Sequence, residues 1–172
     1  MTREEVILVD DCDRETGRME KMRAHHLGSL HRAFSVFLFN EKGELLLQQR
    51  AALKYHSAGL WTNTCCGHPR PGEVIKSAAA RRLNEELGIQ APMAHSFRFR
   101  YRSELANGLT EHEIDHVFIG TCFRNPIPNP DEVQQWKYIS ADAINAGLKQ
   151  DPANFTAWFR LVWPVVHDWI NA

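Results

Sequence analysis

The sequence lacks an apolar run long enough to cross a membrane. Its most apolar stretch, residues 155–170, is interrupted by Arg160, Pro164, His167 and Asp168, whereas a spanning helix needs about 20 consecutive apolar residues. The first residues, MTREEVILVDD, place acidic side chains on both sides of a short apolar run, which is unlike a signal or transit peptide. We therefore expect a cytoplasmic protein that does not bind membranes.

The sequence also has no excess of charge of either sign, because Lys and Arg total 20 and Asp and Glu total 21. A balanced surface gives no general attraction to nucleic acid, so an anion bound here must be small and held by a local group of cations. With 172 residues, of which 44% are hydrophobic, the chain can bury a sizeable core. No repeat, linker or exposed heptad pattern interrupts it, so we expect one domain and a monomer.

Cysteine is scarce, and the four thiols are Cys12, Cys65, Cys66 and Cys122. They would stay reduced in the cytoplasm, and adjacent cysteines such as Cys65 and Cys66 rarely bond to each other. Two interpretations of this adjacent pair stay open: a reactive or metal-facing thiol, and a small buried side chain.

The apolar patterns predict strands, one central helix and two helices near the end of the chain. Alternating or short apolar runs bounded by turn residues predict strands at 6–11, 18–23, 33–40, 45–50, 95–104 and 110–120. A stripe of apolar residues at i, i+4 spacing predicts a helix over 74–87, and weaker patterns predict helices around 140–148 and 153–171. Strands come first and helices end the chain, an order that favours an α+β fold with a mixed or antiparallel sheet.

The loop before the predicted central helix has an unusual composition. Its residues, WTNTCCGHPRPGE, are poor at burying apolar area, so a role other than packing is favoured. On the helix itself, Arg81 and Glu85, like Arg82 and Glu86, are i, i+4 pairs. Taken alone, such pairs indicate only a solvated helix face.

The spacing across this loop and helix resembles the Nudix box. Eight of nine specified positions match in register, namely Gly67, Glu73, Arg81, Leu83, Glu85, Glu86, Gly88 and Ile89. The departure is Arg82, where the pattern has Glu. The resemblance implies a Nudix-like fold around the box helix, in which carboxylates hold Mg²⁺ against a diphosphate. Because Arg82 replaces an acidic residue with a cation, the departure favours binding of a diphosphate over its hydrolysis.

A second set of candidate metal ligands lies mostly outside the box. It consists of imidazoles and carboxylates, namely His25, His26, His31, His68, Glu111 and Glu113. Three imidazoles and two carboxylates at i, i+2 on one strand face can close around a divalent ion with mixed nitrogen and oxygen ligation. The sequence leaves open whether that ion is Zn²⁺, Mn²⁺ or Mg²⁺.

Together these motifs resemble the type 1 isopentenyl-diphosphate isomerases, a branch of the Nudix fold. The similar segments are LHRAFSVFLFN, LLLQQR, WTNTCCGHP, RRLNEELG, FRYR and EHE, within about residues 4–160. The resemblance implies a single Nudix-like isomerase domain over residues 1–172. Its reaction would convert isopentenyl diphosphate reversibly into dimethylallyl diphosphate, by protonation and deprotonation through a carbocation-like intermediate. That product is the allylic starter for isoprenoid biosynthesis.

The resemblance also implies the residues that do the chemistry. Cys66 and Glu113 would exchange the two protons, with either of them as the donor, and nearby cationic groups and metal would favour the Cys66 thiolate. The Tyr101 hydroxyl would lie within reach of Glu113, and the indole of Trp158 would face the cation.

Two metal sites and a cationic patch complete what the resemblance implies. The second divalent metal would be held by His25, His31, His68, Glu111 and Glu113, with His26 as an alternative to His25. Glu86 and the backbone carbonyl of Cys66 would hold the Mg²⁺ that arrives with the diphosphate. The phosphates themselves would be met by Lys21, Arg50, Lys54 and Arg82.

Two other functions compete with this interpretation. A Nudix hydrolase would share the box helix and Mg²⁺ but would have no need for Cys66 or for the histidine cluster. A non-catalytic zinc-stabilised module built on CCGH is also conceivable, although adjacent cysteines fit poorly with the two-residue spacing usual in structural zinc sites.

Overall fold

The computed structural model describes residues 3–172, and Met1 and Thr2 lie outside the described part. The strands are β1 (Glu5–Val9), β2 (Glu15–Glu20), β3 (His31–Phe39), β4 (Leu45–Arg50), β5 (Trp61–Thr62), β6 (Cys65–Gly67), β7 (Met93–Glu104), β8 (Thr110–Thr121) and β9 (Val133–Ile139). The helices are α1 (Lys21–Leu27), α2 (Ile75–Leu87), α3 (Ala141–Gln150) and α4 (Ala157–Ile170), with short 3-10 turns η1 (Ala106–Gly108) and η2 (Pro152–Asn154).

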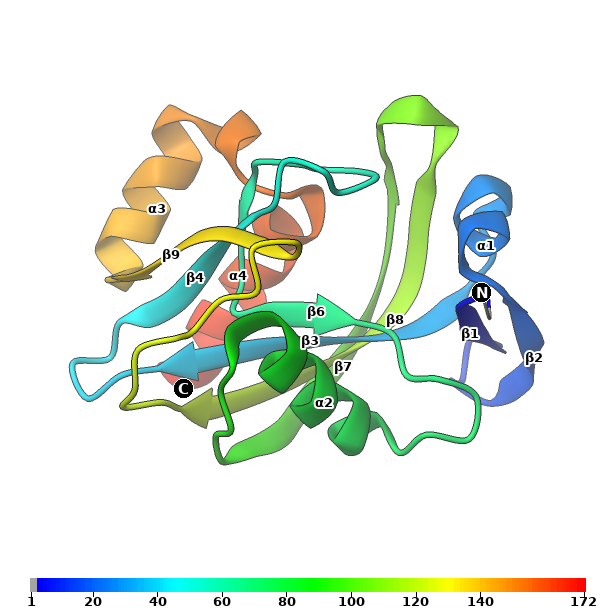
Figure 1. Ribbon diagram of the computed structural model, residues 1–172, viewed down its shortest axis with the longest axis horizontal. Helices are drawn as coiled ribbons and strands as arrows, with labels where there is room; N and C mark the ends of the chain where they lie inside the picture. The colour runs from blue at the N-terminus through cyan, green and yellow to red at the C-terminus, as the bar shows by residue number, and fades with distance from the viewer. Residues whose placement is uncertain (1–2) are drawn as a thin grey trace.

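The strands form one mixed sheet (Figure 1). β3 pairs in parallel with β8 along its whole length, from His31 opposite Glu113 to Phe39 opposite Thr121. On its other edge β3 meets β1, β6 and β4 in turn, and all three pairings are antiparallel. The predicted α+β class is therefore confirmed, with a mixed sheet.

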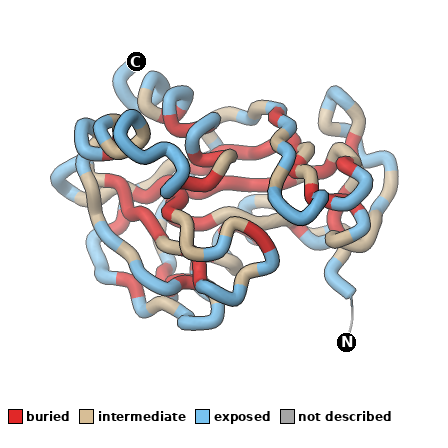
Figure 2. Tube along the Cα trace, turned by 90° about the horizontal axis from the view of Figure 1, so that it is seen from above, coloured by how far each residue is buried: buried red, intermediate tan, exposed pale blue. Residues whose placement is uncertain are grey.

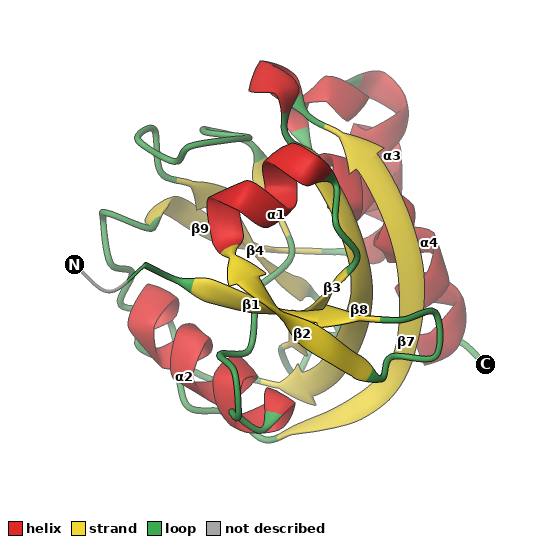
Figure 3. Ribbon diagram, turned by 90° about the vertical axis from the view of Figure 1, so that its right-hand side faces the viewer, coloured by secondary structure: helices red, strands yellow, loops and turns green. Residues whose placement is uncertain are grey.

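Helices cover both faces of this sheet (Figure 3). α2 packs on one face, where Leu83 joins Phe34 and its neighbours in one apolar core. α4 packs on the other face, where Phe159 joins Phe37 in a second core. Because side chains alternate along a strand, β3 supplies its even-numbered residues to one core and its odd-numbered residues to the other. The central strands are accordingly buried along most of their length (Figure 2).

The predicted box helix is confirmed as α2. It ends at Gly88, whose φ of 62° lies in the left-handed region that glycine adopts without strain. α3 and α4 confirm the two weaker helix predictions, with boundaries shifted by a few residues. Within residues 3–172, no helix has both the length and the apolar character needed to cross a membrane.

The prediction of a strand over 18–23 was only partly right. β2 ends at Glu20, and α1 begins at the next residue. The Glu20 carboxylate accepts hydrogen bonds from the backbone N–H groups of Met22 and Arg23, which caps the helix, and Gly28 in the left-handed region ends it. This single cap turns the chain so that His25 faces inward.

Three short or irregular strands were not predicted. β5 and β6 lie inside the stretch that sequence composition indicated as a loop, and β9 pairs with β4 along its length. At β6 the sheet is tight, because a Cβ on Gly67 would come within 2.9 Å of the Phe34 ring. The cysteine pair is thus held as part of the sheet and not as a free loop.

Candidate active site

A cavity of about 130 Å³ gathers most of the predicted site residues. It is lined from several elements, including α1, β3, β4, β6, α2, β8 and the start of α4. Of the predicted residues, its lining includes Lys21, Arg50, Lys54, Cys66, His68, Arg82, Glu86, Tyr101, Glu111, Glu113 and Trp158. Residues from distant parts of the chain thus meet in one place.

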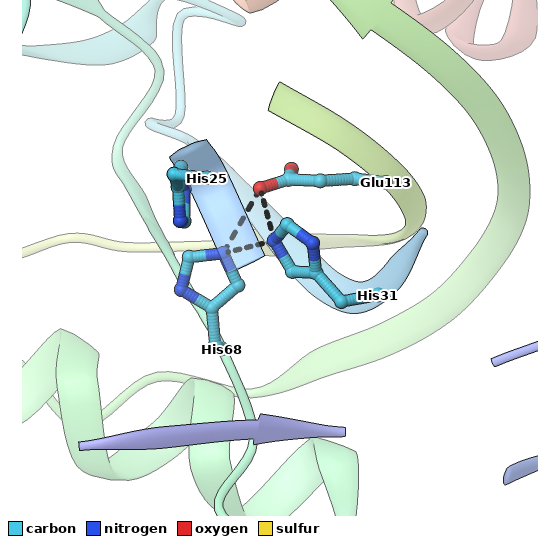
Figure 4. A group of neighbouring side chains, drawn as sticks. All are labelled: His25, His31, His68 and Glu113. Carbon is cyan, nitrogen blue, oxygen red and sulfur yellow. Dashed lines mark hydrogen bonds and ion pairs between the residues drawn. The ribbon is translucent and has the colours of Figure 1, made fainter. Parts of the chain in front are cut away.

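Three imidazoles and one carboxylate converge beside this cavity, and we name His25, His31, His68 and Glu113 the His/Glu centre (Figure 4). Nε2 of His68 lies 2.9 Å from Oε1 of Glu113 and 3.2 Å from Nε2 of His31. Nε2 of His31 lies 3.2 Å from the same carboxylate oxygen. His31 and Glu113 meet because they are register partners across the parallel β3–β8 pair.

His25 completes the centre from α1. Its ring lies 5.0 Å from the His31 ring and 5.5 Å from the His68 ring, centroid to centroid. One potential ligand atom from each of the four residues lies within 4.8 Å of the other three. His26, the alternative to His25, is exposed on the same helix and does not join this cluster.

The donor set fits a divalent metal ion. Nδ1 of His25 and of His31 lies 2.8 Å from the carbonyl oxygen of Lys21 and of Ser29, respectively. A carbonyl only accepts, so each neutral ring carries its proton on Nδ1 and leaves a lone pair on Nε2. Nε2 of His25 is buried without a hydrogen-bond partner among the described residues. Nε2 of His31 lies 3.2 Å from a carboxylate oxygen of Glu113, and a cation between these two atoms would have both as ligands.

The two carboxylates of β8 are linked by Tyr101. Its buried hydroxyl lies 2.7 Å from Oε2 of Glu113 and 3.0 Å from Oε2 of Glu111. Burial alone would raise the pKa of Glu113, but the imidazoles of His31 and His68 lower it well below its usual range. Burial, and then repulsion from Glu113, raises the pKa of Glu111 well above its usual range. The two groups therefore differ in their tendency to hold a proton.

Cys66 approaches the cavity from the other edge of β3. It lies on β6 as the register partner of Ser35, while Glu113 lies on β8 as the partner of His31. Ser35 and His31 are four residues apart on one strand, so their side chains, and those of their partners, project from the same face of the sheet. The sulfur and the carboxylate thus reach one cavity from opposite edges of β3.

Burial and nearby charge act in opposite directions on Cys66. Burial raises the pKa of its thiol well above the ordinary value, and the lowering effect of Arg50 does not compensate. Burial therefore favours the neutral thiol, and the expected thiolate depends on a bound metal as well as on nearby cations. Cys65 points to the opposite face, fully buried in the core beneath α2.

Four cations line the cavity, and three of them are held by carboxylates. Lys21 lies 3.0 Å from Glu4, Lys54 contacts Glu132, and Arg82 lies 3.3 Å from Glu132. Nε of Arg50 is buried with no hydrogen-bond partner among residues 3–172. The predicted diphosphate-binding residues are thus brought together along one cavity, which is also lined by the carboxylates of Glu4, Glu86, Glu111, Glu113 and Glu132.

Glu86 faces the cavity from the last turn of α2. Its two oxygens accept hydrogen bonds of 2.7 Å from Arg82 and from the side-chain amide of Gln48. The side chain is buried, so these two donors fix its orientation. Of the other box carboxylates, Glu73 accepts two hydrogen bonds from Arg81, which also contacts Glu85. These ion pairs connect the loop before α2 to the helix, and their residues do not line the cavity.

Trp158 closes one wall of the cavity. It is the second residue of α4, and its indole N–H donates a hydrogen bond of 3.3 Å to Asn63. The Arg50 guanidinium lies 5.2 Å from the indole ring centroid. This aromatic face is therefore already oriented toward positive charge.

Sequence analysis missed His56, which lies in the loop between β4 and β5. Its ring is 5.8 Å from Trp158 and 6.1 Å from His25, and it is buried beside Glu111. Nothing in the spacing of KYHS signals this position. Neither of the two groups of side chains in residues 3–172 that could hold an ion contains a cysteine, so the zinc-module interpretation receives no support.

Comparison with known proteins agrees with this geometry. The NUDIX domain family matches residues 29–159. An isopentenyl-diphosphate Delta-isomerase from Pectobacterium atrosepticum is 50% identical over 168 residues, which cover 98% of this chain and 94% of that protein. Isopentenyl-diphosphate Delta-isomerase 1 from Aromatoleum aromaticum is 52% identical over 157 residues, covering 91% of this chain and 89% of that one.

Solved structures agree on the fold. A protein from Deinococcus radiodurans superposes with a TM-score of 0.78 at 19% identity, over 94% of this chain and 98% of that one. The sheet, the box helix and the cavity beside it define a protein of the NUDIX domain class. Within that class, the chain belongs to the family of isopentenyl-diphosphate Delta-isomerases.

Proposed function

We propose that this protein catalyses the reversible isomerisation of isopentenyl diphosphate to dimethylallyl diphosphate, which supplies the allylic starter of isoprenoid biosynthesis. Relatives about half identical to the chain over nearly its whole length carry this activity in their names. One structural observation supports the proposal most strongly. A neutral thiol and a carboxylate line the same small cavity from opposite edges of β3, and cations line it with them.

The charged end of the substrate would be held by the cations. Arg50 has a free buried N–H, and Lys21, Lys54 and Arg82 lie along the same cavity. Glu86 and the backbone carbonyl of Cys66 would hold the Mg²⁺ that accompanies the diphosphate and neutralises its charge. Arg82 and Gln48 already fix the Glu86 carboxylate in one orientation.

The hydrocarbon end would then lie between Cys66 and Glu113. Adding a proton to the terminal CH₂ of the alkene leaves a tertiary cation, and removing a proton from the carbon on its other side forms the new double bond. One group must deliver a proton and the other must accept one. Cys66 holds a proton that it can give, and the lowered pKa of Glu113 keeps its carboxylate ionised and able to accept one. The reaction is reversible, so the two groups exchange roles between directions.

Neighbouring side chains would orient Glu113 and stabilise the cation that forms between Glu113 and Cys66. Tyr101 holds the Glu113 carboxylate by its Oε2 atom, which leaves Oε1 toward the imidazoles. Trp158 would present its ring face to the tertiary cation, a contact worth about 2 kcal/mol when water is excluded. A divalent ion bound by the His/Glu centre would supply positive charge that tunes the acidity of the carboxyl group. Zn²⁺, Mn²⁺ and Mg²⁺ are the candidate ions.

Deuterium uptake tests this function directly. The protein is incubated with isopentenyl diphosphate and Mg²⁺ in heavy water, and the products are followed by proton and phosphorus NMR. We expect dimethylallyl diphosphate with deuterium in the methyl group and an intact diphosphate. Release of inorganic phosphate without deuterated product would instead indicate a Nudix hydrolase and would refute the proposal.

The proposal extends to the setting of the enzyme. We propose a single domain over residues 1–172 that acts as a cytoplasmic monomer on a small-molecule substrate. Its balanced charge supports the absence of nucleic-acid binding.

A further inference from the structure

His56 is the one buried imidazole beside the cavity, among the described residues, to which the reaction outlined above gives no role. It lies in the loop between β4 and β5, and only 7% of its surface is exposed. Its Nδ1 atom lies 3.1 Å from the Ser57 hydroxyl. Its Nε2 atom is directed to Glu111, with 3.8 Å between Nε2 and Oε1.

The arrangement around Glu111 repeats that around Glu113. Tyr101 contacts the Oε2 atom of both carboxylates, so each has its Oε1 atom free for an imidazole. For Glu113 the facing imidazoles are His31 and His68, and for Glu111 the facing imidazole is His56. His25 stands between the two sets, because ligand atoms of His25, His56 and Glu111 also lie within 4.8 Å of one another.

We propose that His56 supplies a fourth imidazole, together with Glu111, to the divalent ion held by the His/Glu centre. His25 carries its proton on Nδ1, so Nε2 is its only ligand atom, and that single lone pair is common to both sets. One lone pair binds one ion, so the two sets describe one ion and not two. This inference rests on the metal site of the proposed function, and it adds a ligand that the sequence did not suggest.

Within each set, the distances are those of ligands around an ion. Two donors bound at about 2.1 Å to the same ion lie about 3 to 4 Å apart. The 2.9 and 3.2 Å separations among Glu113, His68 and His31, and the 3.8 Å separation between Glu111 and His56, fall in or next to this range. His25 is the ligand that the two sets share, so His56 and Glu111 would reach the ion of the His/Glu centre by closing on this common ligand. The 3.8 Å gap between His56 and Glu111 is too long for a hydrogen bond, so direct pairing does not explain it.

The other nitrogen of His56 has the partner that a metal-bound histidine needs. Nδ1–H can donate to the Ser57 oxygen, which leaves the Nε2 lone pair toward Glu111. Packing of the ring edge against Trp158 fixes its orientation.

A fourth imidazole has a consequence for metal choice. Imidazole nitrogen suits Zn²⁺ and similar transition metals, whereas carboxylate and water oxygens suit Mg²⁺. Four nitrogen donors with two carboxylates therefore favour Zn²⁺ over Mg²⁺. Loss of His56 should weaken Zn²⁺ more than Mg²⁺.

Metal affinity of the metal-free protein tests the proposal without reference to turnover. Zn²⁺ affinity is measured by competition with a chromophoric chelator, and Mg²⁺ affinity by calorimetry, for the wild type, His56→Ala, His56→Gln and the exposed control His26→Ala. We expect both His56 variants to bind Zn²⁺ about tenfold or more weakly, while Mg²⁺ affinity changes about twofold or less and His26→Ala matches the wild type. His56→Gln keeps a side chain against Trp158, and circular dichroism checks that it folds.

Cobalt provides a second readout. The visible d–d absorption of the Co²⁺-loaded protein should differ between the wild type and His56→Gln, because a ligand has been lost. Wild-type Zn²⁺ affinity together with an unchanged Co²⁺ spectrum in His56→Gln would overturn the proposal and leave His56 as a packing residue. If the wild type itself binds no Zn²⁺, the His/Glu centre fails as a metal site. Isomerase activity, measured separately by deuterium uptake, distinguishes that result from a failure of the proposed function.

Discussion

Tyr101→Phe removes one oxygen atom from the centre of the proposed machinery. That hydroxyl is buried between Glu111 and Glu113, 3.0 Å from one carboxylate and 2.7 Å from the other. The phenyl ring keeps its stacking on Phe99, at 5.4 Å between centroids. The substitution therefore tests the hydrogen bond with little change in packing.

The expected loss follows from the strength of this bond. A hydrogen bond to a charged group contributes about 1.5–3 kcal/mol, and about 1.4 kcal/mol corresponds to a factor of ten in rate. If the hydroxyl holds the Glu113 carboxylate in its reactive orientation, kcat should fall by about 10- to 100-fold. The KM should change little, because Tyr101 is not among the residues proposed to hold the diphosphate.

The assay is the rate of dimethylallyl diphosphate formation from isopentenyl diphosphate at saturating substrate. Tyr138→Phe is the matched control, since its hydroxyl donates to the Arg124 carbonyl at 3.0 Å and Tyr138 does not line the cavity. Wild-type kcat in Tyr101→Phe, or equal losses in both variants, would refute the reasoning about Glu113.

The other predictions concern the remaining parts of the site and the fold. Cys66→Ser should reduce kcat by about 100-fold or more, since it removes one proton-exchanging group; full activity in this variant would exclude the catalytic role. Trp158→Ala should reduce kcat by about 30-fold, from a contact of about 2 kcal/mol, with a much smaller change in KM; equal losses in both would argue against a cation-facing ring. Chelation of metal should lower the Tm of the wild type by removing about 2.7 kcal/mol of stability at an ion concentration 100 times Kd; a Tm that does not respond to chelator would count against an occupied centre. Burial raises the pKa of Asp13, but hydrogen bonds from Arg32 and His116 lower it overall, and burial lowers the pKa of His116. Both groups bind protons more weakly when folded, so the free energy of unfolding in urea should fall as pH drops below about 6.5, where His116 of the unfolded chain binds a proton, and fall again below about 4, where Asp13 of the unfolded chain does; a flat profile would contradict this, and Asp13→Asn should reduce the loss below about pH 4.

The sequence was most informative where spacing reports geometry. The i, i+4 stripe of residues 74–87 specified α2, and the family resemblance carried by the motifs TNTCCGHP and EHE implied Cys66, His68 and Glu113, which line the cavity. Each of these signals is local, so it survives in a single sequence. The meeting of His31 with Glu113 is not local, because it depends on the register of a parallel strand pair.

Other parts of the site depend on contacts that no pattern encodes. Residues 21–23 were predicted as the end of a strand, whereas the cap made by the Glu20 side chain starts α1 at Lys21. His56 was missed because its loop has no periodicity, and only the packing against Trp158 brings it to Glu111. Spacing also does not report the burial of Cys66, which raises the pKa of its thiol against the effect of nearby cations.

The central claim is that a sulfur and a carboxyl group act on the substrate from two sides. A crystal structure of the metal-loaded protein with an unreactive isopentenyl diphosphate analogue would test it most directly. The account predicts the five-carbon chain between Cys66 and Glu113, with its diphosphate at Arg50 and Glu86. A hydrocarbon tail outside this cavity, or both groups on the same side of it, would contradict the account.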